Sequence, residues 1–384
     1  MTFSFRFDPI SLPEEAKALQ EEVRAFLREE AARGGFTPGK GGFSREFGRK
    51  VGARGWLGMT WPKKYGGGER SQLERYVVTE EMLAWGAPTR SFSTGDRQSG
   101  PMLLRYGQEE IKEKILPRIV RGELCFCIGL SEPNSGSDVF AASTRAKKTA
   151  GGWLVNGRKI WTSNAHEADY MIALLRTSPP TPENRRHGLS QFLVEMRAPG
   201  MTIRPIINLT GSHEFNEVVF DDVFLPDSHL VGDLDMAWKQ ATDELAFERS
   251  GPDRWIETFP CFVEFVRQRG AEPSERVAEG IGRAVAELMT LRRMSLSVAG
   301  MLQAGKSPIA EAALVKDLGT NFEQALPDKI RLLAPPLSDE DPDANDARFE
   351  EALRHATLIA PKLTIQGGTR EVLRGIIARG LGLR

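Results

Sequence analysis

Residues 151–164 read GGWLVNGRKIWTSN, and the pattern that starts in this region decides the fold. β-Branched and aromatic residues dominate the run, and glycine and asparagine interrupt it, which is typical of short antiparallel strands. Similar short segments follow, namely ADYMIALLRTS, GLSQFLVEM, MTIRPI and NEVVFDDVFLP. We therefore expect about 100 residues of antiparallel β-structure, beginning near Leu124.

Helical patterns flank this β-region on both sides. In residues 12–35, LPEEAKALQEEVRAFLREEAARGG, apolar side chains recur at helical spacing at Ala16, Leu19, Val23, Phe26 and Leu27. The pattern is again helical from Trp238 to the end, where one long helix is marked by Val277, Ile281, Ala284, Leu288 and Leu291. Residues 333–346, LAPPLSDEDPDAND, are acidic and rich in proline, so we expect a mobile loop there.

This order of patterns predicts an α+β fold with three domains. We expect an N-terminal helical domain over residues 1–124, a central antiparallel β-domain over 125–232 and a C-terminal helical bundle over 233–384. A glycine-rich and aromatic stretch at residues 55–68, GWLGMTWPKKYGGG, should form a packed loop within the first domain.

The composition argues against several classes of partner. The 384 residues include 51 Lys and Arg and 52 Asp and Glu, and such a balance does not favour nucleic acid or an anionic membrane surface. No apolar run approaches the roughly 20 residues of a membrane span, and the first residues, MTFSFRFDPI, lack an export signal, so we expect a cytoplasmic protein. The 3 cysteines fit neither a disulfide framework nor a metal site, and we expect buried thiols.

Two neighbouring stretches have the composition of a ligand site. Residues 130–139, LSEPNSGSDV, place hydroxyl groups and turn N–H groups around a proline, and such a turn either binds a polar ring edge or a phosphate or is an ordinary surface turn. Trp161 and Ser163 then lie two residues apart on an expected strand, so they should share a face. An aromatic plane beside a hydroxyl suits a flat heterocycle, although a core tryptophan next to a strand-edge serine explains the same pattern.

A third stretch, LTIQGGTREVLRG at residues 363–375, combines a tight turn with a helix start. Gly367 and Gly368 permit left-handed backbone and close approach of a ligand, and a helix after Thr369 would present free N–H groups. The turn contains no acid, base or nucleophile.

These motifs resemble those of the acyl-CoA dehydrogenase family, which pairs a T/S-E-P-x-x-G-S-D turn with a K-x-W-x-T/S-N strand. Residues 217–226, EVVFDDVFLP, are similar to the family's signature before its C-terminal helices. The resemblance implies the helix–β–helix layout from about residue 14 onwards and a bound FAD, with its isoalloxazine ring between the β-domain and the C-terminal helices. By this match Ser131 and Ser137 would bind the flavin or its phosphates, Trp161 and Ser163 would contact the ring, and Thr369 and Glu371 would reach the cofactor.

The resemblance also implies a catalytic base in an altered position. Many members carry a Tyr-Glu-Gly-Thr turn whose glutamate removes the α-proton of the acyl-CoA, and here Gly367 replaces that glutamate. A subgroup places Glu-Arg on the helix after the β-domain, and Glu248-Arg249 matches it. Glu248 would then be the base, and Arg249 would orient it or pair with it. Gly367 would leave room for the Glu248 carboxylate, and Gly367 and Gly368 would bind the substrate. The alternative is a surface carboxylate paired with a neighbouring arginine.

Two family elements are absent, and both bear on partners. The Arg-x-x-Phe-Gly and Gln-x-x-Gly-Gly motifs, through which homotetrameric members share FAD, have no match here. The chain therefore resembles either an altered homo-oligomer or the base-bearing subunit of a heteromeric, steroid-side-chain type enzyme, or it is a non-catalytic partner. The expected product is a 2,3-enoyl-CoA, with electrons passing to an electron-transferring flavoprotein. An acyl-CoA oxidase or a nitroalkane-oxidase-like enzyme is the alternative activity, and the acyl group is open among straight-chain, branched, aromatic and steroid-derived thioesters.

Overall fold

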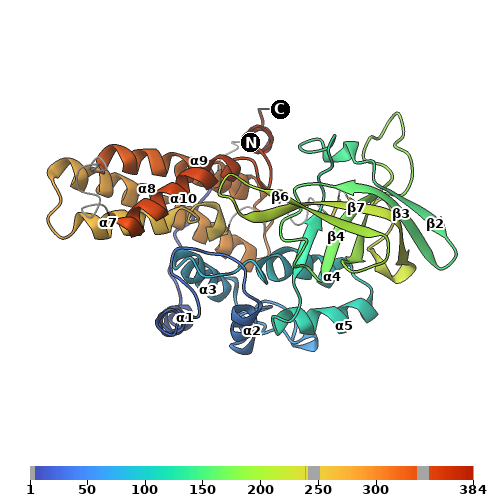
Figure 1. Cartoon of the computed structure of the whole chain (residues 1–384), viewed down its shortest axis with the longest axis horizontal. Coiled ribbons are helices and arrows are strands. Elements are labelled where there is room, and N and C mark those ends of the chain that lie inside the picture. Colours follow the sequence, from blue (N-terminus) through green and yellow to red (C-terminus); the bar gives the residue numbers. More distant parts are fainter. Residues whose placement is uncertain (1–4, 238, 241–250, 335–345, 384) are drawn as a thin grey trace. The chain divides into compact units, whose positions relative to one another are not determined.

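The computed structural model describes residues 5–237, 239–240, 251–334 and 346–383 (Figure 1). These residues belong to two compact units. The first unit lies within Met1–Gly42, Ser71–Pro88 and Ala246–Arg384, and the second within Phe43–Arg70 and Thr89–Leu245. The N-terminal helices are therefore shared between the two units. The division of the sequence into three domains at residues 124 and 232 stays a prediction.

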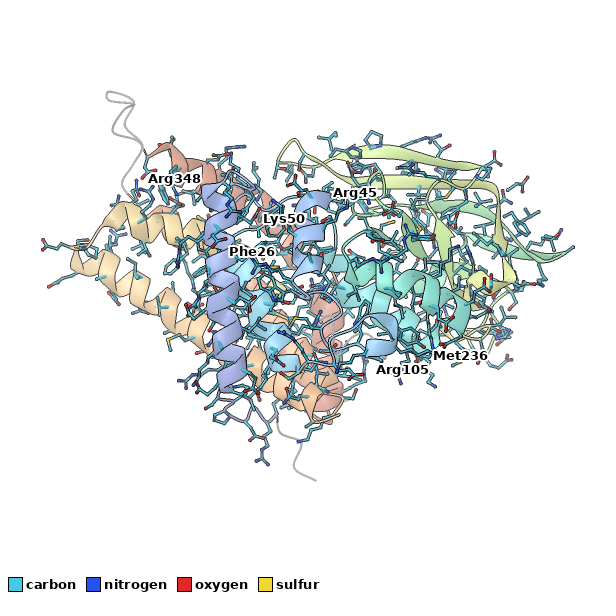
Figure 2. The ribbon with its side chains drawn as sticks, turned by 90° about the horizontal axis from the view of Figure 1, so that it is seen from below. Phe26, Arg45, Lys50, Arg105, Met236 and Arg348 are labelled. Carbon is cyan, nitrogen blue, oxygen red and sulfur yellow. The ribbon has the colours of Figure 1, made fainter. Side chains whose placement is uncertain are left out.

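The first unit is helical. Its described helices are α1 (Glu14–Ala32), α3 (Gln72–Ala84), α7 (Phe259–Arg269), α8 (Glu275–Gln303), α9 (Ile309–Leu333), α10 (Ala347–Leu363) and α11 (Arg370–Gly380). Helices α8, α9 and α10 lie side by side in the orange-to-red part of Figure 1. The predicted first helix is confirmed, and its apolar stripe, which includes Phe26 (Figure 2), is buried because α1 packs on α3.

The long C-terminal helix is also confirmed, as α8. Val277, Ala284, Leu288 and Leu291 are all buried, as the helical spacing predicts. Residues 335–345, most of the expected mobile loop, lie outside the described residues. So do residues 241–250, where the first C-terminal helix is expected. The described chain resumes at Asp346, whose carboxylate caps α10 by accepting hydrogen bonds from the N–H groups of Arg348 and Phe349.

The second unit combines short helices with a sheet. Its helices are α2 (Arg45–Ala53), α4 (Gly100–Tyr106) and α5 (Glu109–Val120). Its strands are β1 (Phe126–Gly129), β2 (Arg145–Thr149), β3 (Gly152–Lys159), β4 (Tyr170–Arg176), β5 (Leu189–Glu195), β6 (Met201–Ile207), β7 (His213–Pro226) and β8 (Leu230–Val231). The order across the sheet is β6-β7-β3-β2-β4-β5-β8, and β1 pairs with β4. The predicted fold class is confirmed.

The sheet is antiparallel except at two pairings that involve β4. Strand β1 runs parallel to β4 over four residue pairs, and β2 meets β4 in parallel at one pair, Arg145 with Arg176. Strands β2 and β3 lie between β1 and β4 in the sequence, and this long connection allows the chain to return in the same direction. Sequence alternation describes which face is buried but does not identify the partner strand, so a purely antiparallel sheet was the simplest prediction.

Two smaller predictions concern packed side chains. The stretch at residues 55–68 is a packed loop, because Trp56, Met59 and Trp61 are all buried in it. Cys125 and Cys261 are buried free thiols, and burial raises the pKa of each to about 12, which keeps them protonated and unreactive.

Within the described residues, no helix is both long and apolar enough to span a bilayer.

Candidate functional site

A buried ion pair joins the turn at residues 130–139 to the end of β3. Lys159 Nζ lies 2.7 Å from Glu132 Oε1, and both side chains are almost fully buried. The Glu132 carboxylate also accepts hydrogen bonds from Ser143 N at 2.7 Å and from Thr144 N at 3.0 Å. Burial alone would raise the pKa of Glu132, but the charge of Lys159 and these donors outweigh it and lower the pKa to about 2. The carboxylate is therefore ionised and held by fixed donors.

Backbone and side-chain hydrogen bonds hold the turn that carries Ser131 and Ser137. Ile160 N donates to Ser131 O at 2.9 Å, so the backbone of Ser131 is tied to the residue after β3. Ser135 is buried and its hydroxyl donates to Asp138 O at 2.9 Å, which closes the turn. Ser131 is half-buried and Ser137 is exposed. The two serines predicted to bind the cofactor therefore lie on a turn whose backbone is fixed from within.

Trp161 and Ser163 follow β3 and are not part of it. The strand ends at Lys159, and Trp161 has a left-handed backbone with φ +59°, so the prediction that both residues lie on one strand is wrong. Both side chains are nevertheless exposed while Thr162 between them is buried. The Trp161 side chain is 57% exposed, and its ring meets the edge of Phe215 at a centroid distance of 6.1 Å. A bare indole face on fixed backbone beside serine hydroxyls fits a flat, polar-edged group such as the isoalloxazine ring of FAD.

The C-terminal glycine turn lies in the first unit. Gly367 and Gly368 have φ +66° and +101°, values that only glycine adopts without strain, and α11 begins at Arg370 as the sequence predicts. Thr369 caps this helix by accepting a hydrogen bond from Val372 N at 3.4 Å. The fully buried Lys316 on α9 donates to Gly368 O at 2.8 Å.

The residues on either side of the turn are also held by polar contacts. Hydrogen bonds from its own backbone N–H and from the Thr369 hydroxyl lower the pKa of the exposed Glu371. On the other side, Gln366 Nε2 donates to Glu257 Oε2 at 3.5 Å, and Lys362 Nζ lies 3.4 Å from Glu257 Oε1. Thr369 and Glu371 thus form the polar start of a helix, where both side chains hydrogen-bond backbone N–H groups of the first turn.

The predicted base, Glu248, and its neighbour Arg249 lie outside the described residues. The described chain resumes at Gly251, followed by a short 3₁₀ turn, Pro252–Arg254. Gly367, Gly368, Thr369 and Glu371 lie on one turn of the first unit. In the second unit the Ile160 N–Ser131 O hydrogen bond brings the serine-rich turn to the residue before Trp161.

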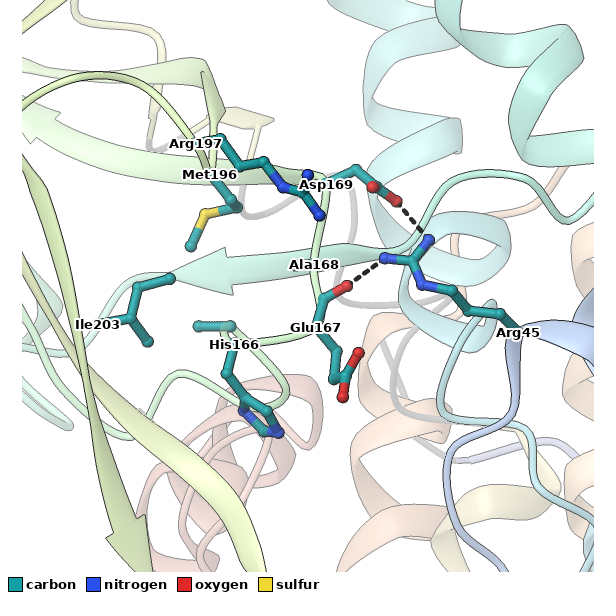
Figure 3. Close-up of a pocket in the computed structure, with 9 residues that line it drawn as sticks. Arg45, His166, Glu167, Ala168, Asp169, Met196, Arg197 and Ile203 are labelled. Atoms are coloured by element: carbon teal, nitrogen blue, oxygen red, sulfur yellow. Dashed lines mark hydrogen bonds and ion pairs between the residues drawn. The ribbon is translucent and has the colours of Figure 1, made fainter.

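A polar pocket of about 250 Å³ lies in the second unit (Figure 3). Its lining includes Ala165, which directly follows the tryptophan segment, by which we mean residues 161–164. Arg45, on α2 (Figure 2), donates to Asp169 Oδ2 at 2.9 Å and to the carbonyl of Glu167. His166 also lines the pocket, together with Ala165, Ala168, Met196, Arg197 and Ile203. None of the site residues predicted from the sequence lines it.

Sequence reasoning gave no role to four buried polar residues that hold these segments: Glu132, Lys159, Asn216 and Lys316. Glu132 and Lys159 stand inside the two quoted motifs, and opposite charges inside two ligand motifs are a signal of pairing. Asn216 and Lys316 have no such signal, because only the fold shows that they are buried.

Comparisons with known proteins agree with this architecture. The family model "Acyl-CoA dehydrogenase, N-terminal domain" matches residues 13–123, and "Acyl-CoA dehydrogenase, middle domain" matches residues 127–223. Acyl-CoA dehydrogenase FadE34 of Mycobacterium tuberculosis is 32% identical over 86% of this chain, which spans 45% of that longer relative. Acyl-CoA dehydrogenase FadE26 of the same organism is 34% identical, and the match covers 90% of this chain and 89% of FadE26.

Solved structures are similar over nearly the whole chain. A chain of the ChsE4-ChsE5 complex from Mycobacterium tuberculosis is 30% identical with a TM-score of 0.81, covering 98% of this chain and 100% of that one. A chain of the structure described as the Tcur3481-Tcur3483 steroid ACAD is 29% identical with a TM-score of 0.83, covering 97% and 99%.

Proposed function

The chain belongs to the acyl-CoA dehydrogenase family, and on that premise we propose that it catalyses the α,β-dehydrogenation of an acyl-CoA thioester to a 2,3-enoyl-CoA. FAD, when bound, supplies the acceptor for a hydride from the β-carbon. The protein's own part is to hold the flavin and the thioester, to exclude water from them and to remove the α-proton.

One observation carries this proposal: an exposed tryptophan on left-handed backbone stands beside a serine-rich turn, and a buried ion pair fixes the turn. Trp161 and Ser163 would contact the flavin ring. Ser131 and Ser137 would bind its polar edge or its phosphates. Thr369 and Glu371 would reach the cofactor from the start of α11. These roles agree with the exposure of each side chain.

Glu248 is the proposed base that removes the α-proton, with Arg249 orienting or pairing with it. Gly367 supports this assignment, because it leaves the turn without the carboxylate that many family members place there. Removing a weakly acidic α-proton needs a positioned base and donors to the thioester oxygen, where the developing charge collects. Backbone N–H groups are the donors expected from the chain.

A heteromer with a related chain is the proposed assembly. Two of the structures that this chain resembles carry two protein names each, ChsE4-ChsE5 and Tcur3481-Tcur3483, and the motifs through which homotetrameric members share FAD are absent here. By the same comparison a steroid-derived thioester is the first substrate class to test. An electron-transferring flavoprotein is the proposed partner for reoxidation, and the cytoplasm the proposed location.

The experiment begins with the chain purified alone and co-expressed with a related chain. Yellow protein only after co-expression is the expected result. The yellow preparation is then given straight-chain, branched, aromatic and steroid-derived acyl-CoA thioesters with an artificial electron acceptor, first without air and then in air. We expect mass spectrometry to show that one class of thioester loses two hydrogen atoms per molecule. Turnover should require the artificial electron acceptor and should not depend on air.

A preparation that binds FAD and oxidises no acyl-CoA in any arm would contradict the proposed activity. Turnover in air without the acceptor would instead identify an oxidase. A chain that is yellow and active when purified alone would contradict the heteromer and leave the dehydrogenation intact.

A further inference from the structure

Asn216 holds both backbone groups of the residue between Trp161 and Ser163. It lies on β7 and is fully buried. Thr162 N donates to Asn216 O at 3.1 Å, and Asn216 Nδ2 donates to Thr162 O at 3.0 Å. One residue of the sheet thus fixes the peptide on each side of Thr162, immediately after the left-handed backbone of Trp161.

The hydrogen-bond chemistry around Asn216 allows a single arrangement. A carbonyl oxygen can only accept, so the amide nitrogen of Asn216 must face Thr162 O. Its second N–H then points to His166 Nδ1 at 3.1 Å, and that ring nitrogen must be unprotonated. The amide oxygen faces His213 Nε2 at 2.7 Å, and that nitrogen must carry a proton. All three partners are satisfied only while His166 is neutral.

The two histidine rings support each other as a stack. Their centroids lie 3.7 Å apart with 17° between the planes, and His166 lines the polar pocket (Figure 3). The charged groups around the stack come from several elements: Arg45 on α2, Glu167 and Asp169 before β4, Arg197 after β5, and Glu214 on β7 with its ion-pair partner Arg90. Positively and negatively charged side chains both surround the two stacked rings, so neither sign of charge dominates there.

We propose that Asn216 is a positioning residue for the flavin ring, because it fixes the Trp161–Ser163 segment and is itself oriented by its hydrogen bonds to the stacked rings of His166 and His213. This inference rests on the proposed function, since it takes Trp161 and Ser163 as ring contacts.

If Asn216 has this role, lowering the pH should loosen the Trp161–Ser163 segment. Burial and the nearby His213 lower the pKa of His166 below its ordinary value of 6.5, so the folded protein favours the neutral ring. The contribution of neutral His166 to the stability of the folded protein is therefore complete above about pH 6.5 and is lost as the pH falls below this value.

The test uses Asn216→Asp, which keeps the shape and removes both N–H donors. Near neutral pH a carboxylate would face Thr162 O without a proton between them, so we expect FAD to bind at least about tenfold more weakly than to the wild type. On acidification the variant should improve relative to the wild type, because protonated His166 can donate to the new carboxylate. The matched control is Asn156→Asp, on β3 of the same sheet, which contacts the exposed Asp222 and should leave FAD binding unchanged.

Two further measurements keep the test decisive. Hydrogen exchange of residues 161–164 in the FAD-free protein reports the segment directly, and Asn216→Asp should accelerate it even if FAD never binds. His166→Gln should abolish the acid sensitivity of the wild type. The proposal is overturned if Asn216→Asp leaves both exchange and FAD affinity unchanged, or if His166→Gln keeps the full acid sensitivity. If the wild type binds no FAD with any partner, the proposed function fails, and the exchange result still decides the role of Asn216.

Discussion

Glu132 and Lys159 show how a single ion pair can hold two motifs that lie 27 residues apart. The carboxylate accepts hydrogen bonds from Lys159, from the Ser143 N–H and hydroxyl, and from Thr144 N–H. A buried charge is tolerated only when an opposite charge and hydrogen-bond donors or acceptors surround it, so the ion pair and its hydrogen-bond donors stabilise the turn together. The pair ties the turn that carries the half-buried Ser131 to the end of β3, just before the exposed Trp161.

Removing one partner of this ion pair should strongly reduce the stability of the folded protein. Glu132→Gln leaves the Lys159 ammonium buried without a counter-charge, and we expect a loss of about 3–5 kcal/mol in the free energy of unfolding. The double variant Glu132→Gln with Lys159→Met should lose less than the single one, because no uncompensated charge remains. Asp227→Asn, which breaks an exposed ion pair with Lys148 on the same sheet, is the control and should change stability by about 1 kcal/mol or less. Denaturant unfolding of the FAD-free protein measures all three.

The pH dependence of the same variants gives a second readout. The pKa of Glu132 falls from 4.5 to about 2 on folding, so its contribution is present above pH 4.5 and is lost as the pH falls towards 2. The wild type should therefore lose stability over this range more steeply than Glu132→Gln. Parallel curves for the two proteins, or a single variant as stable as the wild type, would contradict the role given to the pair.

At the residue scale the motifs pointed to proposed cofactor contacts and not to the buried residues that support them. The motifs pointed to Ser131, Ser137, Trp161 and Ser163; the last three are exposed and Ser131 is half-buried. The strand assignment of Trp161 was wrong because the residue types around it suit a strand, whereas the strand ends at Lys159 and the backbone of Trp161 is left-handed. A φ angle leaves little trace in a sequence when the residue is not glycine.

Among the elements, α9 supports the glycine turn. Lys316 extends from the buried side of this helix and donates to Gly368 O, one residue before the cap of α11. The turn has left-handed backbone at two successive glycines, which are the most flexible residues in an unfolded chain. The contact from α9 therefore contributes to holding the start of α11, together with the Thr369 cap.

Lys316→Met should loosen this turn and spare the helix that carries it. Methionine has a similar length and suits a buried position, but it cannot donate to Gly368 O. We expect amide exchange in residues 367–373 to rise about tenfold, the effect of losing one hydrogen bond to a buried charged donor. Lys329→Met, on the same helix but exposed and paired with Glu287, should leave that exchange unchanged. Equal exchange in the two variants would show that Lys316 does not hold the turn.

Element prediction succeeded where one face of a helix or strand is buried. The stripes of α1 and α8 follow from helical spacing because each helix covers a core on one side only. The parallel pairing of β1 with β4 has no such signature. Register and direction depend on the connection between strands, which is a long-range property of the fold.

For the whole molecule, the order of helical and β patterns was sufficient to predict the fold class. The site was harder, because its proposed residues come from four separated stretches of the sequence. Composition and periodicity do not bring such stretches together. Only the resemblance in motifs connected the serine-rich turn, the tryptophan segment and the glycine turn to one cofactor.

The central claim is that Glu248 removes the α-proton of an acyl-CoA, and replacing this one carboxylate tests it most directly. The measurement is turnover of the best thioester by Glu248→Gln in the FAD-loaded assembly, beside Glu272→Gln, an exposed glutamate between α7 and α8. We expect Glu248→Gln to keep its yellow colour and to lose at least about a hundredfold in kcat, since general-base catalysis contributes 10²–10⁴-fold. Glu272→Gln should match the wild type. A Glu248→Gln protein that turns over at the wild-type rate would contradict the account.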